Sequence, residues 1–307
     1  MSVAEILNFY LKNGADMFDK ASMFRRLQYS YNSEPLAKQL KGVFGEQTTL
    51  GSEDIETLLL LVMRNATTDS PWPISNNPFA KYSDPSHPAC NLRLPLWQLV
   101  RASTAAPTYF PPEVIPLGDK PFVFVDGGVT MYNNPAFQMF LMATVDRYWP
   151  KAPPAQRGWE TGADKMLIVS IGTGTSPGAK ASLTPGEMNL LFNAQNIPSA
   201  LMYAALNEQD FLCRIFGDCV AGGILDREVD TMVASTGPLQ EKLFRYARYN
   251  AELTTEGLRA LGCAKVVPEE VQKLDSIDAI PSLEQVGKAV AERDVNPAHF
   301  DFAAFPP

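Results

Sequence analysis

The spacing of apolar residues predicts that the chain begins with helices. Between residues 3 and 11 the apolar side chains recur with helical spacing, which places them on one face of a helix. Asn13-Gly14 is a turn signal, so we expect a break there. Apolar positions continue through Met17 and Phe18 to Phe24, and the helix is expected to resume over this stretch.

The next part of the chain changes character several times. Residues 34–43 predict a short helix that ends at Gly45. Residues 57–63 are almost entirely apolar, a pattern that fits a buried strand and a buried helical turn equally well. Residues 67–88 are rich in Pro, Asn, Ser and Asp, and this composition predicts a loop region.

Two continuous apolar strands are predicted in the middle of the chain. A helix over 94–105 precedes the first strand, 122–125, which stops at Asp126-Gly127-Gly128. Asn134-Pro135 then opens another helix, because Asn caps a helix and Pro fits its first turn. The second strand is 166–171. Strands that are apolar along their whole length are typical of a sheet covered on both faces, so the pattern predicts the α/β class.

Helices dominate the remainder of the sequence. The elements expected there are a helix over 198–216, a strand over 243–249, a helix over 254–261 and a last helix that begins with a capping box of Ser282 and Gln285. We find no internal repeat and no convincing linker. Residues 1–307 are therefore interpreted as one domain, with a mostly helical part at 177–307.

The charge balance excludes some classes of partner. The chain has 307 residues, a formal net charge of −8 and a sequence pI of about 4.9. A nucleic-acid partner is not expected, because binding to phosphates in nucleic acid requires a basic face. No cluster of Lys and Arg suggests anchoring on anionic lipid, although peripheral contact with a membrane stays open. No cofactor is expected.

Neither an export signal nor a membrane span is recognisable. The longest apolar run, 58–63, is much shorter than the roughly 20 residues of a transmembrane helix. The N-terminus lacks a basic region and a cleavage site, so a cytoplasmic location is expected. Cys90, Cys213, Cys219 and Cys263 show no metal-binding spacing, and we expect buried reduced thiols and no metal site.

Asp126-Gly127-Gly128 is the first candidate for chemistry. An Asp at the end of a buried strand lies where an α/β sheet presents reactive groups. Glycine lets the backbone turn sharply and leaves the carboxylate approachable. However, Asp-Gly is also one of the commonest turn signals, and the triplet alone favours an ordinary turn.

Segments on both sides of the triplet change this interpretation. They are LWQLVRASTAAPTYFPP at 96–112, MYNNPA at 131–136 and KMLIVSIGTGTS at 165–176. Their order closely resembles the C-terminal half of the patatin-like phospholipase family. CRIFGDCVAGGILDREV at 213–229 and FRYARYN at 244–250 are similar to bacterial members. The resemblance spans most of the chain and is most specific over 96–176.

The resemblance implies a serine acyl hydrolase that cleaves acyl esters of phospholipids with a Ser–Asp dyad. Asp126 matches the family's base, which takes the proton directly from the nucleophilic serine, and Gly127 and Gly128 complete the motif. The implied fold is a three-layer sandwich around a central, mostly parallel sheet, without cofactor or metal. An inactive lipid-binding or regulatory fragment of the same fold is the alternative.

The family's nucleophile sits in a GxSxG elbow between a strand and a helix, and this chain is expected to lack the GxSxG pattern. Ser103, Ser170 and Ser176 are not predicted to stand on a turn of that kind. Residues 3–18 resemble the part of the family that follows the elbow, so the N-terminal strands are expected to be missing. The chain alone is then expected to expose apolar strand edges and to be poorly soluble.

Three further features have more than one interpretation. GTGTSPG at 172–178 is similar to the phosphate loop of a nucleotide-binding protein, but its spacing and the lack of a following Lys favour a structural turn. Tyr109-Phe110-Pro111-Pro112 fits an acyl-chain entrance and ordinary core packing equally well. His87 and His299 are interpreted as solvated surface residues.

Overall fold

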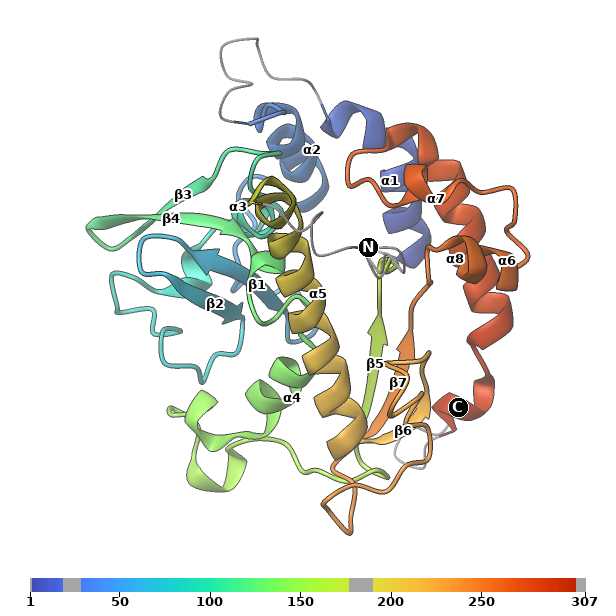
Figure 1. Ribbon diagram of the computed structural model, residues 1–307. Helices are drawn as coiled ribbons and strands as arrows, with labels where there is room; N and C mark the ends of the chain where they lie inside the picture. Colours follow the sequence, from blue (N-terminus) through green and yellow to red (C-terminus); the bar gives the residue numbers. More distant parts are fainter. Residues whose placement is uncertain (1, 19–28, 177–189, 302–307) are drawn as a thin grey trace. The chain divides into compact units, whose positions relative to one another are not determined.

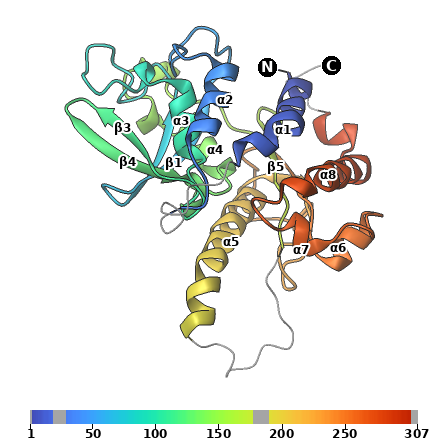
Figure 2. The same cartoon turned by 90° about the horizontal axis from the view of Figure 1, so that it is seen from above.

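The computed structural model describes residues 2–18, 29–176 and 190–301 of the chain. Figures 1 and 2 show its elements from two directions. The contacts divide the chain into two compact units, and each is described here by itself. Unit 1 comprises Met1–Asn133 and Leu141–Trp159, and unit 2 comprises Asn134–Phe140 and Glu160–Pro307.

Unit 1 is built on a four-stranded antiparallel sheet in the order β2-β1-β4-β3. The strands are β1 (Leu60–Asn65), β2 (Ser70–Ser75), β3 (Glu113–Leu117) and β4 (Lys120–Asp126), and the helices are α1 (Val3–Met17), α2 (Glu34–Phe44) and α3 (Leu96–Ser103). Helix α3 packs on this sheet, where Leu99 is fully buried against Met63 and Phe124. This core fixes the end of β4, which carries Asp126.

Helix α1 runs without interruption through Asn13-Gly14, so the predicted break is wrong. The Ser2 hydroxyl accepts from the N–H of Glu5, and the Glu5 carboxylate accepts from the N–H of Ser2, which completes a capping box. This cap offsets the roughly 1 kcal/mol that an internal glycine costs a helix. Phe24, where the helical pattern was expected to continue, lies outside the described residues.

Strand β2 lies inside the segment 67–88 that was predicted to be a loop. Its sequence, SPWPIS, contains two prolines, which cannot donate to a ladder. Because β2 is an edge strand with one open side, these prolines are tolerated there. The ambiguous apolar run at 57–63 leads into β1, so the strand interpretation holds.

Unit 2 contains a three-stranded parallel sheet in the order β5-β7-β6. Its strands are β5 (Leu167–Ile171), β6 (Asp218–Ala221) and β7 (Arg245–Tyr249), and its helices are α5 (Leu190–Phe216), α6 (Thr255–Ala260), α7 (Pro268–Val271) and α8 (Ile280–Asp294), while α4 (Ala136–Thr144) crosses the boundary between the units. Helices α5 and α8 both contact β7 and lie on opposite sides of the sheet (Figures 1 and 2). The predicted α/β class is confirmed.

Most predicted elements of unit 2 are present, with two differences. Helix α5 begins before Pro198 and includes this proline. The last helix, α8, begins after Ala279 without a side-chain cap, so the predicted capping box of Ser282 and Gln285 is wrong. Pro281 lies in its first turn, where the fixed backbone angle of proline starts a helix without such a cap. Short 3₁₀ helices are η2 (Asn91–Arg93), η3 (Gly127–Val129), η4 (Asp146–Tyr148), η5 (Pro154–Gln156), η7 (Ile277–Ala279) and η8 (Pro297–Phe300).

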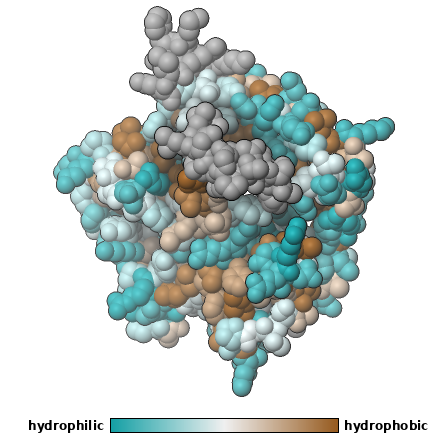
Figure 3. All heavy atoms as spheres, viewed as in Figure 1, coloured by the Kyte–Doolittle hydropathy of each residue, from teal (hydrophilic) through white to brown (hydrophobic). Residues whose placement is uncertain are grey.

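The surface mixes apolar and polar residues. On the face seen in Figure 3, apolar residues form small groups among hydrophilic ones. Two exposed apolar residues, Val169 and Ile171, lie on β5, which is an edge strand of its sheet. No helix within the described ranges combines the length and the apolar composition that crossing a membrane requires.

Candidate active site

Asp126 is the last residue of β4, and backbone contacts fix its position. Its N–H donates to the carbonyl of Ala105 (3.0 Å), and it lies opposite Met63 in the register of β1 and β4. Its Oδ1 accepts a hydrogen bond from the N–H of Gly128 (2.6 Å), which caps the short helix η3. Within unit 1, this half-buried carboxylate is therefore oriented by a backbone donor.

Gly127 is required for packing. An added Cβ would lie 2.3 Å from the carbonyl oxygen of Val62, far inside contact distance. The carbonyl of Gly127 also accepts a hydrogen bond from Thr130 Oγ1 (2.7 Å). The close approach to β1 allows the chain to turn immediately after Asp126, so the two glycines have separate roles. Gly127 makes room for β1, and Gly128 donates to the carboxylate.

The surroundings of Asp126 favour its use as a base. Burial raises the pKa of its carboxyl above the ordinary value of 3.8, and the hydrogen bond from Gly128 opposes this shift. Among the described residues of unit 1, no cation forms an ion pair with it. A carboxylate without a positive partner keeps its affinity for a proton, which a general base requires.

The sheet around Asp126 differs from the expected parallel arrangement. Strand β4 pairs antiparallel with both β1 and β3. A tight turn at Gly118, which has a φ of 63°, joins β3 to β4, and strands connected in this way must run antiparallel. Asp126 does end a strand, but of the two apolar strands predicted in the middle of the chain only β5 lies in a parallel sheet.

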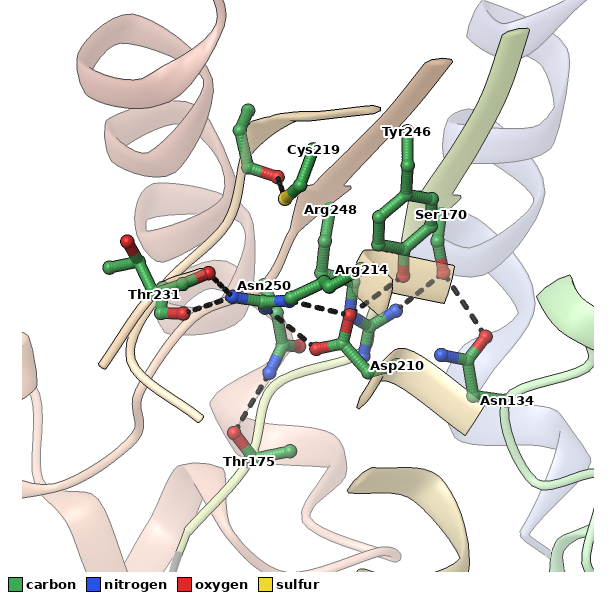
Figure 4. Close-up of polar contacts among 12 residues, drawn as sticks. Asn134, Ser170, Thr175, Asp210, Arg214, Cys219, Thr231, Tyr246, Arg248 and Asn250 are labelled. Atoms are coloured by element: carbon green, nitrogen blue, oxygen red, sulfur yellow. Dashed lines mark hydrogen bonds and ion pairs between the residues drawn. The ribbon is translucent and has the colours of Figure 1, made fainter. Parts of the chain in front are cut away.

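Unit 2 contains a buried polar network that sequence reasoning missed (Figure 4). Arg214 binds Asp210, one turn earlier on α5, through Nε–Oδ1 (3.0 Å) and Nη2–Oδ2 (2.7 Å) contacts. The hydroxyl of Tyr246 on β7 donates to Oδ1 of the same carboxylate (2.8 Å). Arg214 Nη1 also donates to the carbonyls of Gly223 and Thr231, both at 2.6 Å. The Asp210 carboxylate therefore has three side-chain donors.

Arg248 extends this network on β7. Its Nη1 donates to the hydroxyl of Ser170 (2.9 Å), which donates to Asn134 Oδ1 (3.1 Å). Asn134 also caps α4, because its Oδ1 accepts from the N–H of Ala136 (3.3 Å). Asn134 belongs to the NNPA motif, whereas nothing in the sequence connected Arg248 to it.

Side-chain hydrogen bonds of Asn250 hold the glycine-rich loop that follows β5. Its Oδ1 accepts from the N–H of Gly174 (2.9 Å), and its Nδ2 donates to Thr175 Oγ1 (2.8 Å). Thr175 also pairs with Glu252 as a parallel bridge. Because these contacts bind the loop to Asn250 and Glu252, they favour the interpretation as a structural turn over that as a phosphate loop.

The predictions for the histidines, the cysteines and the aromatic segment agree with the structure in part. His87 is exposed as expected, but His299 is half-buried, with Nδ1 2.8 Å from the Tyr249 hydroxyl, so its interpretation as a solvated residue is wrong. All four cysteines are buried and free, as predicted. Phe110 is buried in a core cluster with Tyr31, which favours core packing over an acyl-chain entrance. Over the described ranges, no group of three or more His, Cys, Asp or Glu residues has the arrangement to hold a metal ion.

Asp126 lies in a segment that known proteins share. The family model described as "Patatin-like phospholipase" matches residues 3–140. These residues belong to the patatin-like phospholipase family. The resemblance found in the sequence motifs is confirmed, and Asp126-Gly127-Gly128 lies within the matched segment. The motifs from residue 165 onward lie beyond it.

Several relatives of the patatin-like segment are phospholipases by name. The 85/88 kDa calcium-independent phospholipase A2 of Mus musculus is 31% identical over 162 residues, which cover 48% of this chain and 18% of the relative. Patatin-17 of Solanum cardiophyllum is 26% identical over 185 residues, which cover 56% of this chain and 42% of the relative. The cGAMP-activated phospholipase of Vibrio cholerae is 32% identical over 109 residues, which cover 35% of this chain and 27% of the relative. This chain therefore spans less than half the length of each of these relatives.

Two of the serines considered as nucleophiles are occupied by other contacts. Ser103, in the patatin-like segment, donates its hydroxyl to the carbonyl of Val62 (2.6 Å). Ser170 is buried between Arg248 and Asn134. Neither hydroxyl has the exposure that a nucleophile elbow provides.

Ser176 requires a correction. Residues 174–178, GTSPG, do spell GxSxG, so the sequence does contain one such pattern. Ser176 does not have the left-handed backbone that marks a strained turn in a non-glycine residue. The helix of an elbow would begin in 177–189, outside the described residues. Ser176 therefore remains a candidate by sequence pattern alone.

Proposed function

We propose that this chain is part of a lipid acyl hydrolase of the patatin type, in which Asp126 is the general base of a Ser–Asp dyad. One observation carries the proposal. Within the patatin-like segment, Asp126 ends a strand with a half-buried carboxylate that a backbone N–H orients and that no cation among the described residues of unit 1 neutralises. The names of the relatives support phospholipid acyl esters as the substrate class, with phospholipase A or lysophospholipase activity.

The proposed reaction uses Asp126 twice. The carboxylate accepts the proton of the serine hydroxyl as the serine oxygen attacks the ester carbonyl carbon. That proton passes to the leaving alcohol, and an acyl-serine ester remains. Water then attacks this ester while Asp126 takes a proton from the water. Asp126 returns this proton to the leaving serine oxygen, which releases the fatty acid and restores the serine. The hydrogen bond from Gly128 keeps the carboxylate in one orientation throughout.

In this proposal the chain supplies the base, and no serine of the chain supplies the nucleophile. Labelling of the 307-residue chain with a fluorophosphonate, which reacts with activated serines, tests this part. We expect no labelled serine. A label on Ser176 that is lost in Ser176→Ala would place the nucleophile within the chain, at the GTSPG pattern, and would overturn the base-only assignment.

The role of Asp126 is tested in the protein that contains both this chain and the nucleophile. Asp126→Asn should lower kcat/KM for a short-chain p-nitrophenyl ester by about 10²–10⁴, the usual contribution of a general base. Asp119→Asn, which changes an exposed carboxylate at the other end of β4, is the matched control and should retain full activity. Unchanged hydrolysis by Asp126→Asn would remove Asp126 from the mechanism.

The second candidate function is a lipid-binding or regulatory fragment without catalysis. The occupied hydroxyl of Ser103 favours it, because this serine lies in the patatin-like segment but donates to Val62. Binding of phosphatidylcholine vesicles by the chain, without release of fatty acid, would support this alternative over hydrolysis.

A further inference from the structure

Unit 2 contains a cavity of about 550 Å³ with a polar wall. It is lined by residues of α5, the end of β7, the segment 223–227 and α6. Cavities that bind small ligands measure about 300–1,000 Å³, so this one is large enough for a small organic molecule. Asp210, Arg214 and Arg248, drawn in Figure 4, belong to its wall.

The buried part of this wall has an excess of positive charge. Arg214, Arg248 and Asp210 are exposed by only 2%, 6% and 4%. Asp210 neutralises Arg214 through two contacts, whereas Arg248 donates to the neutral hydroxyl of Ser170 and has no carboxylate partner among the residues that the structure describes. A buried guanidinium without a counter-charge is unfavourable, so an anion at this place would be stabilised.

The neighbouring titratable groups do not supply the missing negative charge. Burial raises the pKa of the Cys213 thiol and of the Tyr246 hydroxyl, and the nearby Asp210 carboxylate adds to both shifts. Both groups are therefore neutral at physiological pH. The lining also includes Arg227, Arg293, Asp226 and Glu252, which are exposed and contribute two charges of each sign. The excess charge of the cavity is consequently that of Arg248.

A hydroxyl donor accompanies Arg248. Thr175 Oγ1 accepts a hydrogen bond from Asn250 Nδ2 (2.8 Å), and its own hydrogen has no acceptor over the described ranges. Asn250 also lies close to Arg248, because a Cβ added to Gly172 would be 2.1 Å from Asn250 Oδ1 and 2.7 Å from Arg248 Nη2. Thr175, Asn250 and Arg248 all line the cavity, so a charged and a neutral donor face it together.

We propose that this cavity binds a phosphate group, either as free phosphate or as part of a small phosphate ester, with Arg248 as the charged partner and Thr175 as a hydroxyl donor. The planar guanidinium matches two oxygens of a phosphate, and a third oxygen is left for the hydroxyl. The volume leaves room for an organic group on the phosphate. This site goes beyond the proposed hydrolase and does not depend on it.

Calorimetric titration of the 307-residue chain at constant ionic strength tests the site. Inorganic phosphate and glycerol 3-phosphate are expected to bind, and acetate is expected to bind at least tenfold more weakly. Tighter binding of glycerol 3-phosphate would identify a phosphate ester as the ligand class, and equal binding would identify free phosphate as sufficient. The proposal is overturned if neither phosphate compound binds or if acetate binds equally well.

Three variants locate the binding. Arg248→Gln should weaken phosphate binding about tenfold or more, because it removes a charge-assisted hydrogen bond, and Thr175→Val should weaken it about fivefold. Arg259→Gln is the matched control, because Arg259 is exposed on α6 of the same unit and does not belong to the cavity wall, and phosphate binding by this variant should be unchanged. Binding at the wild-type level by folded Arg248→Gln refutes the proposal. If Arg248→Gln does not fold, unchanged binding by Thr175→Val refutes it instead.

Discussion

Two aspartates, one in each unit, have opposite surroundings. Asp126 in unit 1 is half-buried and accepts a hydrogen bond from the N–H of Gly128. Asp210 in unit 2 is 4% exposed and accepts from two nitrogens of Arg214 and from the hydroxyl of Tyr246. Side-chain donors make three hydrogen bonds to Asp210, whereas Asp126 accepts one from a backbone N–H and retains more acceptor capacity that a reacting proton can use.

This difference separates a structural carboxylate from a candidate base. The contacts of Asp210 join α5 to β7, because Arg214 is on the helix and Tyr246 is on the strand. The contacts of Asp126 orient the carboxylate without joining distant elements. We therefore expect replacement of Asp210 to affect the free energy of unfolding and replacement of Asp126 to affect catalysis.

The largest effect on stability is expected for Asp210→Asn. The variant leaves the guanidinium of Arg214 buried without a counter-charge, which should lower the free energy of unfolding by about 3–5 kcal/mol. Urea unfolding measures this loss. Glu208→Gln, an exposed change on the same helix, is the control and should stay within about 0.5 kcal/mol of the wild type. A loss below about 1 kcal/mol in Asp210→Asn would contradict the structural role of the network.

A smaller loss of stability is expected for Gly127→Ala, which tests how the backbone next to Asp126 is packed. The added methyl group would collide with the carbonyl of Val62, so the free energy of unfolding should fall by about 1–3 kcal/mol. Gly42→Ala in α2 is the matched control, because no atom lies within 4 Å of its added Cβ, and it should stabilise the helix by about 0.5–1 kcal/mol. Equal stability of the two variants would show that Gly127 is not held against β1.

The comparison also explains which residues could be found from the sequence. Asp126 was found because it belongs to a contiguous motif that follows an apolar strand. The network around Asp210 was missed because its members come from β5, α5 and β7, and of its side-chain contacts only that between Asp210 and Arg214 lies within one element. The same-face spacing of Tyr246, Arg248 and Asn250 was the available signal, and it was not used.

Secondary structure was predictable where apolar patterns were long. Both apolar strands and the helices with clear caps are present, and α6 begins directly after its N-cap, Thr254, as the pattern indicated. The edge strands β2 and β3 were missed because each contains proline, which usually argues against a strand. The pairing of β4 could not be read from its composition, because an apolar sequence does not determine the direction of the neighbouring strands.

The smallest expected effect is a pH dependence of stability that comes from Asp126. Burial raises the pKa of this carboxyl in the folded chain above the ordinary value of 3.8, so the folded state holds the proton more tightly than the unfolded state. The free energy of unfolding should therefore fall as the pH rises from 3.8 through the raised pKa, and Asp126→Asn should lack this decrease. Urea unfolding of both chains over a series of pH values gives the difference. Asp119→Asn, the exposed control, should follow the wild type. If the free energy of unfolding of the wild type instead rises with pH relative to that of Asp126→Asn, a positive partner lowers the pKa of Asp126. This carboxylate would then resemble Asp210, and its assignment as a base would be weakened.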